Sequence, residues 1–125
     1  MEFLKENAEY FEKKAYEAMR ERTYKFVLYF TDQALQLYIK YILAKRVGDY
    51  PRTHSFSALF EALEAAGVKA LEFYEEYSDV FDLLEDAYIA VRYLGREYSI
   101  KSAERALETL EKFKEVFMKW LSTTQ

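Results

Sequence analysis

Residues 24–47 read YKFVLYFTDQALQLYIKYILAKRV, and this stretch carries most of the information about the fold. Its apolar residues recur at so many positions that they would cover most of the circumference of an α-helix. A helix that is apolar nearly all round lies either at the centre of its domain or against a partner chain. We therefore expect a central helix, part of whose surface is shared in a homodimer. The residues assigned to that interface are Phe30, Leu37, Tyr38, Tyr41 and Ile42.

The polar exceptions in this helix fall on one side. At 100° per residue, Tyr29, Gln33, Gln36 and Lys40 lie within about 60° of one another and form a narrow polar seam. Two interpretations stay open at this point. The seam is either the solvent-facing side of the helix or a recessed polar site beside apolar walls, which would suit an anionic or base-bearing ligand.

The rest of the chain also has helical periodicity. Apolar residues at three- and four-residue steps predict helices over about residues 2–22, 55–66, 68–90 and 100–121. Thr53 or Ser55 is a suitable N-cap for the third helix, and Gly67 is its expected left-handed stop. No internal repeat or linker divides the sequence. The prediction is one all-α domain over residues 1–125, an up-down bundle of about four to five antiparallel helices.

Composition excludes several classes of protein. With only 3 Gly and 1 Pro the chain has few of the turn residues that an all-β fold needs. It has no Cys and 1 His, so a metal site would rest on carboxylates, and we expect neither a metal nor a cofactor. The sequence has no signal peptide and no apolar run long enough for a membrane span, so we expect a cytoplasmic protein.

Charge is distributed unevenly along the chain. The formal net charge is −4, with +1 in residues 1–62 and −5 in residues 63–125. An acidic protein without a basic stripe is a poor non-specific binder of DNA. Six acidic residues in the predicted fourth helix would share one face, which is either a solvated face or a docking surface for a basic partner. They are Glu72, Glu75, Glu76, Asp79, Asp82 and Asp86.

Four features, taken in order, resemble the HEPN domain family. Residues 30–43 (FTDQALQLYIKYIL) have a Gln-Ala pair, and Lys40 follows Gln33 by seven residues. A glycine loop at Gly48 leads to residues 51–59 (PRTHSFSAL), in which a His precedes the next helix and a Leu follows. Residues 88–93 (YIAVRY) resemble the Tyr…Arg-Tyr signature, and residues 102–117 resemble the family's Ala- and Leu-rich closing helix. The resemblance spans about residues 5–120.

This resemblance implies a function. Members of the family are compact helical bundles that commonly dimerise. Many are partners of minimal nucleotidyltransferases, often as toxin–antitoxin pairs, and a nucleotide-binding role has been proposed for the domain. We expect a nucleotide site in one cleft, where Lys40 and the arginines hold phosphates and Tyr93 or Tyr29 stacks on a base. The residues assigned to the site are Gln33, Lys40, Arg52, His54, Arg92 and Tyr93. Alternatively, these residues only tie the loops to the central helix by hydrogen bonds.

Other members of the family are metal-independent ribonucleases. Their motif is an Arg followed about four to six residues later by a His near the start of the last helix, and the His moves the proton. Here no His follows Arg92, Arg96 or Arg105, and the only histidine, His54, lies in the loop between the helices predicted over residues 24–47 and 55–66. We therefore expect a non-catalytic binding and pairing module. The alternatives are a divergent ribonuclease that uses His54 and a purely structural homodimer, in which His54 caps or packs the loop.

Overall fold

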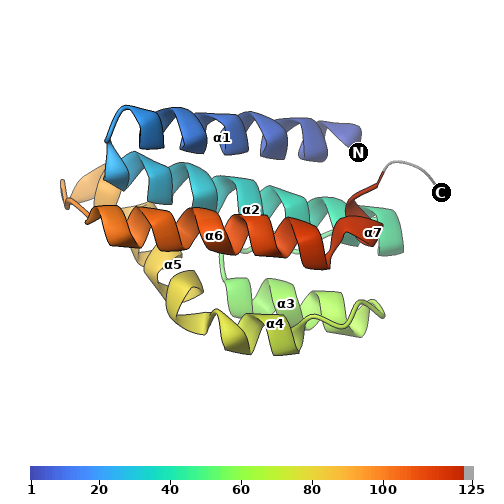
Figure 1. The fold of residues 1–125 in the computed structure, drawn as a ribbon. Coiled ribbons are helices and arrows are strands. Elements are labelled where there is room, and N and C mark those ends of the chain that lie inside the picture. Colours follow the sequence, from blue (N-terminus) through green and yellow to red (C-terminus); the bar gives the residue numbers. More distant parts are fainter. Residues whose placement is uncertain (123–125) are drawn as a thin grey trace.

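The computed structural model describes residues 1–122 and is all-α, with no strand in that range. The chain forms a helical bundle, as predicted. Its long helices run back and forth, and the two short helices α3 and α4 lie together on the side of the bundle away from α1 (Figure 1). The seven helices of this range are α1 (Glu2–Arg20), α2 (Tyr24–Val47), α3 (Phe56–Ala65), α4 (Leu71–Glu76), α5 (Ser78–Tyr93), α6 (Ile100–Val116) and α7 (Met118–Leu121).

Local signals set the ends of the helices around the second loop. Gly48 follows α2 with φ 83°, a left-handed conformation that glycine adopts without steric cost. Ser55 is the N-cap of α3, and its hydroxyl oxygen accepts a hydrogen bond of 3.1 Å from the Ala58 N–H. Gly67, with φ 89°, follows α3 in the left-handed conformation that the sequence predicts. The segment that joins α2 to α3 is therefore fixed at both ends.

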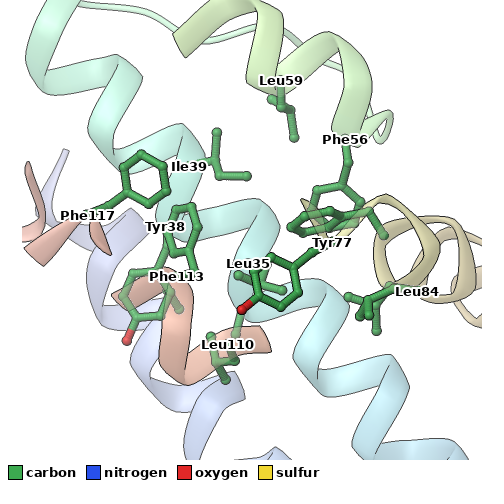
Figure 2. Packing of buried hydrophobic residues seen from close by; sticks show 14 of the residues in the cluster. Leu35, Tyr38, Ile39, Phe56, Leu59, Tyr77, Leu84, Leu110, Phe113 and Phe117 are labelled. Atoms are coloured by element: carbon green, nitrogen blue, oxygen red, sulfur yellow. The ribbon is translucent and has the colours of Figure 1, made fainter. Parts of the chain in front are cut away.

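The helix α2 lies at the centre of the bundle, as its apolar sequence predicts. It packs against α1, α3, α5, α6 and α7, and Figure 1 shows it between α1 and the layer of α3 and α4. Figure 2 shows Leu35 and Ile39 of α2 facing Leu59 of α3, Leu84 of α5 and Leu110 of α6. Among the helices of residues 1–122, none combines the length and the apolar character that crossing a membrane requires.

Aromatic rings fill the core on the α3–α4 side of the bundle. The rings of Phe73 and Phe117 meet edge to face with centroids 5.5 Å apart, and those of Phe113 and Phe117 lie 4.6 Å apart. Phe60 and Phe81 extend this cluster at 5.0 Å. Such tilted and edge-to-face pairs add to the stabilisation that burial of the rings provides. They connect the short helices to the long ones.

The predicted helix over residues 68–90 is wrong in its extent. The structure has two helices there, α4 and α5, which meet at Tyr77 (φ −112°, ψ 21°), and α5 continues to Tyr93 through residues expected in a loop. Buried Phe73, Tyr77 and Phe81 keep helical spacing across the break, so periodicity does not reveal it. The helices separate because α4 packs on α3 whereas α5 packs on α2 and α6. A smaller break at Phe117 similarly divides α6 from α7.

The break at Tyr77 also corrects the expectation of one acidic helix face. Glu72, Glu75 and Glu76 lie on α4, whereas Asp79, Asp82 and Asp86 lie on α5. Two of the six pair within the chain, since Asp79 lies 3.7 Å from Arg105 and Asp86 lies 2.7 Å from Arg96. The acidic residues therefore extend over two helices.

We predict that Leu35→Ala lowers the free energy of unfolding by about 2–5 kcal/mol, because Leu35 is fully buried and the substitution leaves a cavity. Chemical denaturation followed by circular dichroism measures the loss. The matched control is Leu94→Ala, since Leu94 is 65% exposed, and its cost should stay within about 0.5 kcal/mol. Equal effects of the two substitutions would contradict a core centred on α2.

Candidate functional site

The loop of residues 48–55 runs back along the polar seam of α2. The Lys40 Nζ lies 5.8 Å from the ring centre of Tyr50. Further back towards the start of α2, Gln36 Nε2 donates a hydrogen bond of 2.9 Å to the carbonyl oxygen of His54. Gln36 is only 3% exposed, and Lys40 is half-buried. The seam is therefore recessed beneath a loop and is not a plain solvent-facing side.

A buried carboxylate lies under this loop. Asp32 is the only acidic residue of α2, and its side chain has no solvent exposure. Its Oδ2 lies 3.1 Å from His54 Nε2 and accepts a hydrogen bond of 3.2 Å from Gln33 Nε2. Its Oδ1 is buried without a partner. Burial raises the pKa of Asp32, while the bonds to His54 and to the glutamines act in the opposite direction.

The His54 ring extends the site from α2 to α5. Its centroid lies 3.6 Å from that of Tyr88, and Tyr88 stacks in parallel on Tyr29 at 6.0 Å. The Arg92 guanidinium lies 4.8 Å from the Tyr88 ring centre and donates a hydrogen bond of 2.9 Å to the Tyr93 hydroxyl. We call Asp32, His54, Tyr88 and Arg92 the His54 cluster. It links a buried carboxylate to an exposed guanidinium.

A second group of cations lies along the same loop. Arg52 lies 4.3 Å from the ring centre of Tyr50, the ring that Lys40 also approaches. Burial lowers the pKa of Lys40, and the charge of Arg52 lowers it further, whereas Asp32 acts in the opposite direction. Arg52 has one carboxylate near it, Asp49 at 4.0 Å, and both of these side chains are mostly exposed. Lys40 and Arg52 thus approach the same ring, and the exposed carboxylate of Asp49 neutralises their charge only in part.

The structure divides the six residues assigned to the site into two groups. Gln33, His54, Arg92 and Tyr93 belong to one continuous chain of contacts that passes through Asp32 and Tyr88. Lys40 and Arg52 share the Tyr50 ring instead. Both groups lie along the 48–55 loop, and Asp32 acts electrostatically on Lys40.

The residues assigned to the site from the sequence leave out two of its central members, Asp32 and Tyr88, although Tyr88 belongs to the Tyr…Arg-Tyr signature of residues 88–93. Asp32 had a usable signal, because a single acidic residue within an otherwise apolar central helix must find a partner when it is buried. Tyr88 precedes Arg92 by four residues, a spacing at which side chains on a helix touch. Its contact with His54 carries no local signal, because the two residues are 34 positions apart.

Three of the residues assigned to a dimer interface lie inside their own chain. Tyr38 and Tyr41 are each 1% exposed and Ile42 is fully buried. The two tyrosine hydroxyls donate hydrogen bonds to α1, from Tyr38 to Glu12 at 2.6 Å and from Tyr41 to Glu2 at 3.0 Å. The packing of α1 on α2 already covers these side chains, which corrects their assignment. Phe30 and Leu37 remain partly exposed.

Hollows in the surface occur away from the His54 cluster. One of about 480 Å³ lies between α1 and α6, where Lys5, Tyr38, Lys114 and Met118 are among its lining residues. Of these residues, Lys114 already forms an ion pair with Glu12, since its Nζ lies 2.9 Å from each carboxylate oxygen. Another of about 550 Å³ lies beside α4. Within residues 1–122, no three His, Asp or Glu side chains gather as a metal site would require.

Comparison with known proteins identifies one relationship. A family model described as HEPN domain matches residues 1–120 of the chain. No curated protein and no solved structure matches the chain significantly. The match covers every helix except the last residue of α7.

Proposed function

This chain belongs to the HEPN domain family, and from that premise we propose that it is a non-catalytic nucleotide-binding module that pairs with a second protein. The family comprises modules of nucleotide-binding and ribonuclease type. One observation carries the binding proposal: Lys40 and Arg52 both lie against the Tyr50 ring, and the one carboxylate that pairs with Arg52, that of Asp49 at 4.0 Å, is mostly exposed. Two such cations beside aromatic rings suit a ligand that combines phosphates with a base.

The phosphate group would bind between Lys40 and Arg52. The charge of Arg52 lowers the pKa of Lys40, because the two cations repel each other in the free protein. An anion between them removes that repulsion and gains charge-assisted hydrogen bonds from both. The ion pair of Arg52 with Asp49, at 4.0 Å and largely exposed, offers little competition.

For the base, the candidate is an open aromatic ring in the other group of contacts, that of Tyr93. Tyr93 is 69% exposed, and its hydroxyl accepts a hydrogen bond from Arg92, which fixes the phenol next to a guanidinium. Both groups present flat faces of the kind on which nucleobases stack. Tyr29 is less suitable, because its ring already stacks on Tyr88.

A second candidate function, metal-independent ribonuclease, is favoured by the contact between Asp32 and His54. A histidine that is oriented by a buried carboxylate is a common general acid–base arrangement, and Arg92 lies on the same aromatic stack. The proposal of a non-catalytic module rests on the absence from the sequence of the family's Arg–His motif near the last helix.

We predict that ATP binds to the protein and that Lys40→Ala weakens binding about tenfold, the loss expected for one charge-assisted contact to phosphate. Isothermal titration calorimetry without added metal measures both. Lys101→Ala, in an exposed residue of α6, is the matched control and should bind as the wild type does.

Two results would contradict this assignment. If no nucleotide gives a heat of binding, only a structural role remains for the cations. If metal-free protein cleaves RNA and His54→Ala abolishes the cleavage, the second candidate function replaces the first.

We propose further that the chain is a homodimer in which α2 contributes Phe30 and Leu37. These residues are seven positions apart and so lie on one side of the helix. Phe26, one turn before Phe30, stacks on it with centroids 6.1 Å apart and is 39% exposed. This partly exposed apolar stripe adjoins Gln33 and Lys40, so dimerisation there would bring the binding site close to the partner chain.

We predict that Leu37→Asp converts the dimer to a folded monomer, because it puts a charge into the interface but not into the core. Size-exclusion chromatography with light scattering gives the mass, and circular dichroism checks the helical content. Leu71→Asp, in an exposed residue of α4, should leave the dimer intact. Ile42→Asp should unfold the chain, since Ile42 is fully buried. An intact Leu37→Asp dimer would exclude this interface.

The proposed second protein is a minimal nucleotidyltransferase in a pair of toxin–antitoxin type. A surface of exposed acidic residues on α4 and α5 supports docking of a basic partner. Glu72, Glu75, Glu76 and Asp82 form no ion pair with any side chain of residues 1–122. The pKa of Tyr74 is raised by burial and by Asp82, Glu85 and Glu61, in line with a strongly negative local potential.

We predict that Glu75→Lys combined with Glu76→Lys weakens binding to a nucleotidyltransferase by at least about tenfold, because like charges then meet at the contact. The nucleotidyltransferase to use is one encoded by a gene adjacent to the gene for this chain. Surface plasmon resonance at low and high salt measures the change. The control combines Glu6→Lys with Glu104→Lys, two exposed acidic residues on α1 and α6. If the first variant binds as the wild type does, the acidic surface is not part of the contact with the nucleotidyltransferase.

A further inference from the structure

The side chain of His54 joins a buried carboxylate to solvent. Its Nε2 lies 3.1 Å from Asp32 Oδ2, and the side chain is 38% exposed whereas that of Asp32 is fully buried. The other ring nitrogen, Nδ1, makes no hydrogen bond within residues 1–122. Nδ1 is not one of the buried polar atoms that lack a hydrogen-bond partner, so it is accessible to solvent. Nδ1 is therefore the ring nitrogen that remains for a hydrogen bond to a ligand.

The number of protons on the pair decides what Nδ1 offers. With a carboxylate and a neutral imidazole, the ring proton lies on Nε2 towards Asp32, and Nδ1 is a hydrogen-bond acceptor. One more proton changes this, whether it gives an imidazolium or a carboxylic acid that donates to Nε2. In either form Nδ1 carries a hydrogen and is a donor. A phosphate oxygen binds only the donor form.

The environment of the carboxylate favours the additional proton. Asp32 Oδ1 is buried without a partner, so one oxygen of the ionised form is neither hydrated nor hydrogen-bonded. Burial correspondingly raises the pKa of Asp32. Gln36, on the next turn, acts against this shift in the pKa of Asp32, and its own Oε1 is a second buried acceptor without a partner.

The cations around the pair oppose that proton until an anion binds. Lys40 on α2 interacts electrostatically with Asp32, and Arg52 lies on the same loop as His54. From α5, Tyr88 covers the His54 ring and Arg92 lies against Tyr88, while Glu85 bonds to the Phe56 N–H beyond the ring. Tyr29 completes the stack as a neutral group. An anion at Lys40, Arg52 or Arg92 would offset this positive charge.

We propose that phosphate binding and protonation of the Asp32–His54 pair are coupled, so that the pair takes up one proton from solvent as a phosphate oxygen accepts a hydrogen bond from His54 Nδ1. Asp32 is a positioning residue in this scheme, since it acts on the ligand only through His54. The inference rests on the proposed function, because it takes the ligand to be a phosphate ester. Linkage then requires affinity to fall as pH rises, by up to about tenfold per pH unit while the pair deprotonates.

The test uses a ligand whose own charge is constant. In diadenosine diphosphate each phosphorus carries one ester bond, one anhydride bond and a single ionised oxygen, so the charge of the ligand does not change between about pH 5 and pH 9. Calorimetry in buffers of different ionisation enthalpy should detect uptake of about one proton per ligand bound, with affinity that decreases as pH rises. His54 is the only histidine, so ¹⁵N NMR of its ring should report a protonated Nδ1 when this ligand is added.

Two variants separate coupling from a structural role. His54→Gln removes the ring nitrogen through which the protonation of Asp32 reaches the ligand, so binding should become independent of pH and proton uptake should fall to about zero. Asp32→Asn keeps a hydrogen-bonding partner for Nε2 but removes the carboxylate, so the pH dependence should move to lower pH. If Asp32 only supports the fold, this variant would change stability and leave the pH profile in position.

The outcomes also distinguish this inference from the proposed function. Binding with no proton uptake and a flat pH profile would overturn the coupling and leave nucleotide binding intact. If neither ATP nor diadenosine diphosphate binds, and the NMR signals of His54 stay unchanged, the proposed function fails and the coupling fails with it.

Discussion

Burial of α2 on nearly every side is the constraint on which the other features of this protein depend. Five other helices pack against it, and 12 of its 24 residues are buried. The apolar side chains of α2 supply the hydrophobic contacts that hold these helices, at roughly 25 cal/mol for each Å² of apolar surface removed from water. The aromatic cluster of α3, α4, α5 and α6 then closes the side of the core away from α1.

A helix buried in this way must provide partners for each polar group that it carries. Gln36 binds the backbone of the 48–55 loop, and Asp32 binds the side chain of His54 in that loop. The loop is therefore held on α2 by the needs of buried polar groups. Three polar atoms of α2 nevertheless remain without partners, those of Thr31, Asp32 and Gln36. Two of these three belong to the residues that hold the loop, and a proton on Asp32 would relieve part of that cost.

The same arrangement gives the surface its chemical character. His54 connects the buried carboxylate to the aromatic stack of Tyr88 and Tyr29, and Arg92 extends that stack to the surface. Lys40 and Arg52 add two cations farther along the loop. An acidic chain, net charge −4, thus has a local group of cations beside flat rings. This combination supports a small phosphate-bearing ligand better than an extended nucleic acid, which needs a longer basic surface.

The sequence by itself determined the helical class, the central position of residues 24–47, the N-cap of the third helix to within Thr53 or Ser55, and the membership of the HEPN domain family. These features follow from periodicity and local capping, which involve residues close together in the chain. It also indicated most of the polar residues near the loop, although it omitted Asp32 and Tyr88.

Only the tertiary structure decided the break at Tyr77, the burial of Tyr38, Tyr41 and Ile42, and the contact of His54 with Tyr88. The apolar pattern is the same whether a side chain faces its own core or a partner, and it continues across the break. Each of these features depends on which helices pack together, and so on contacts between residues far apart in the chain.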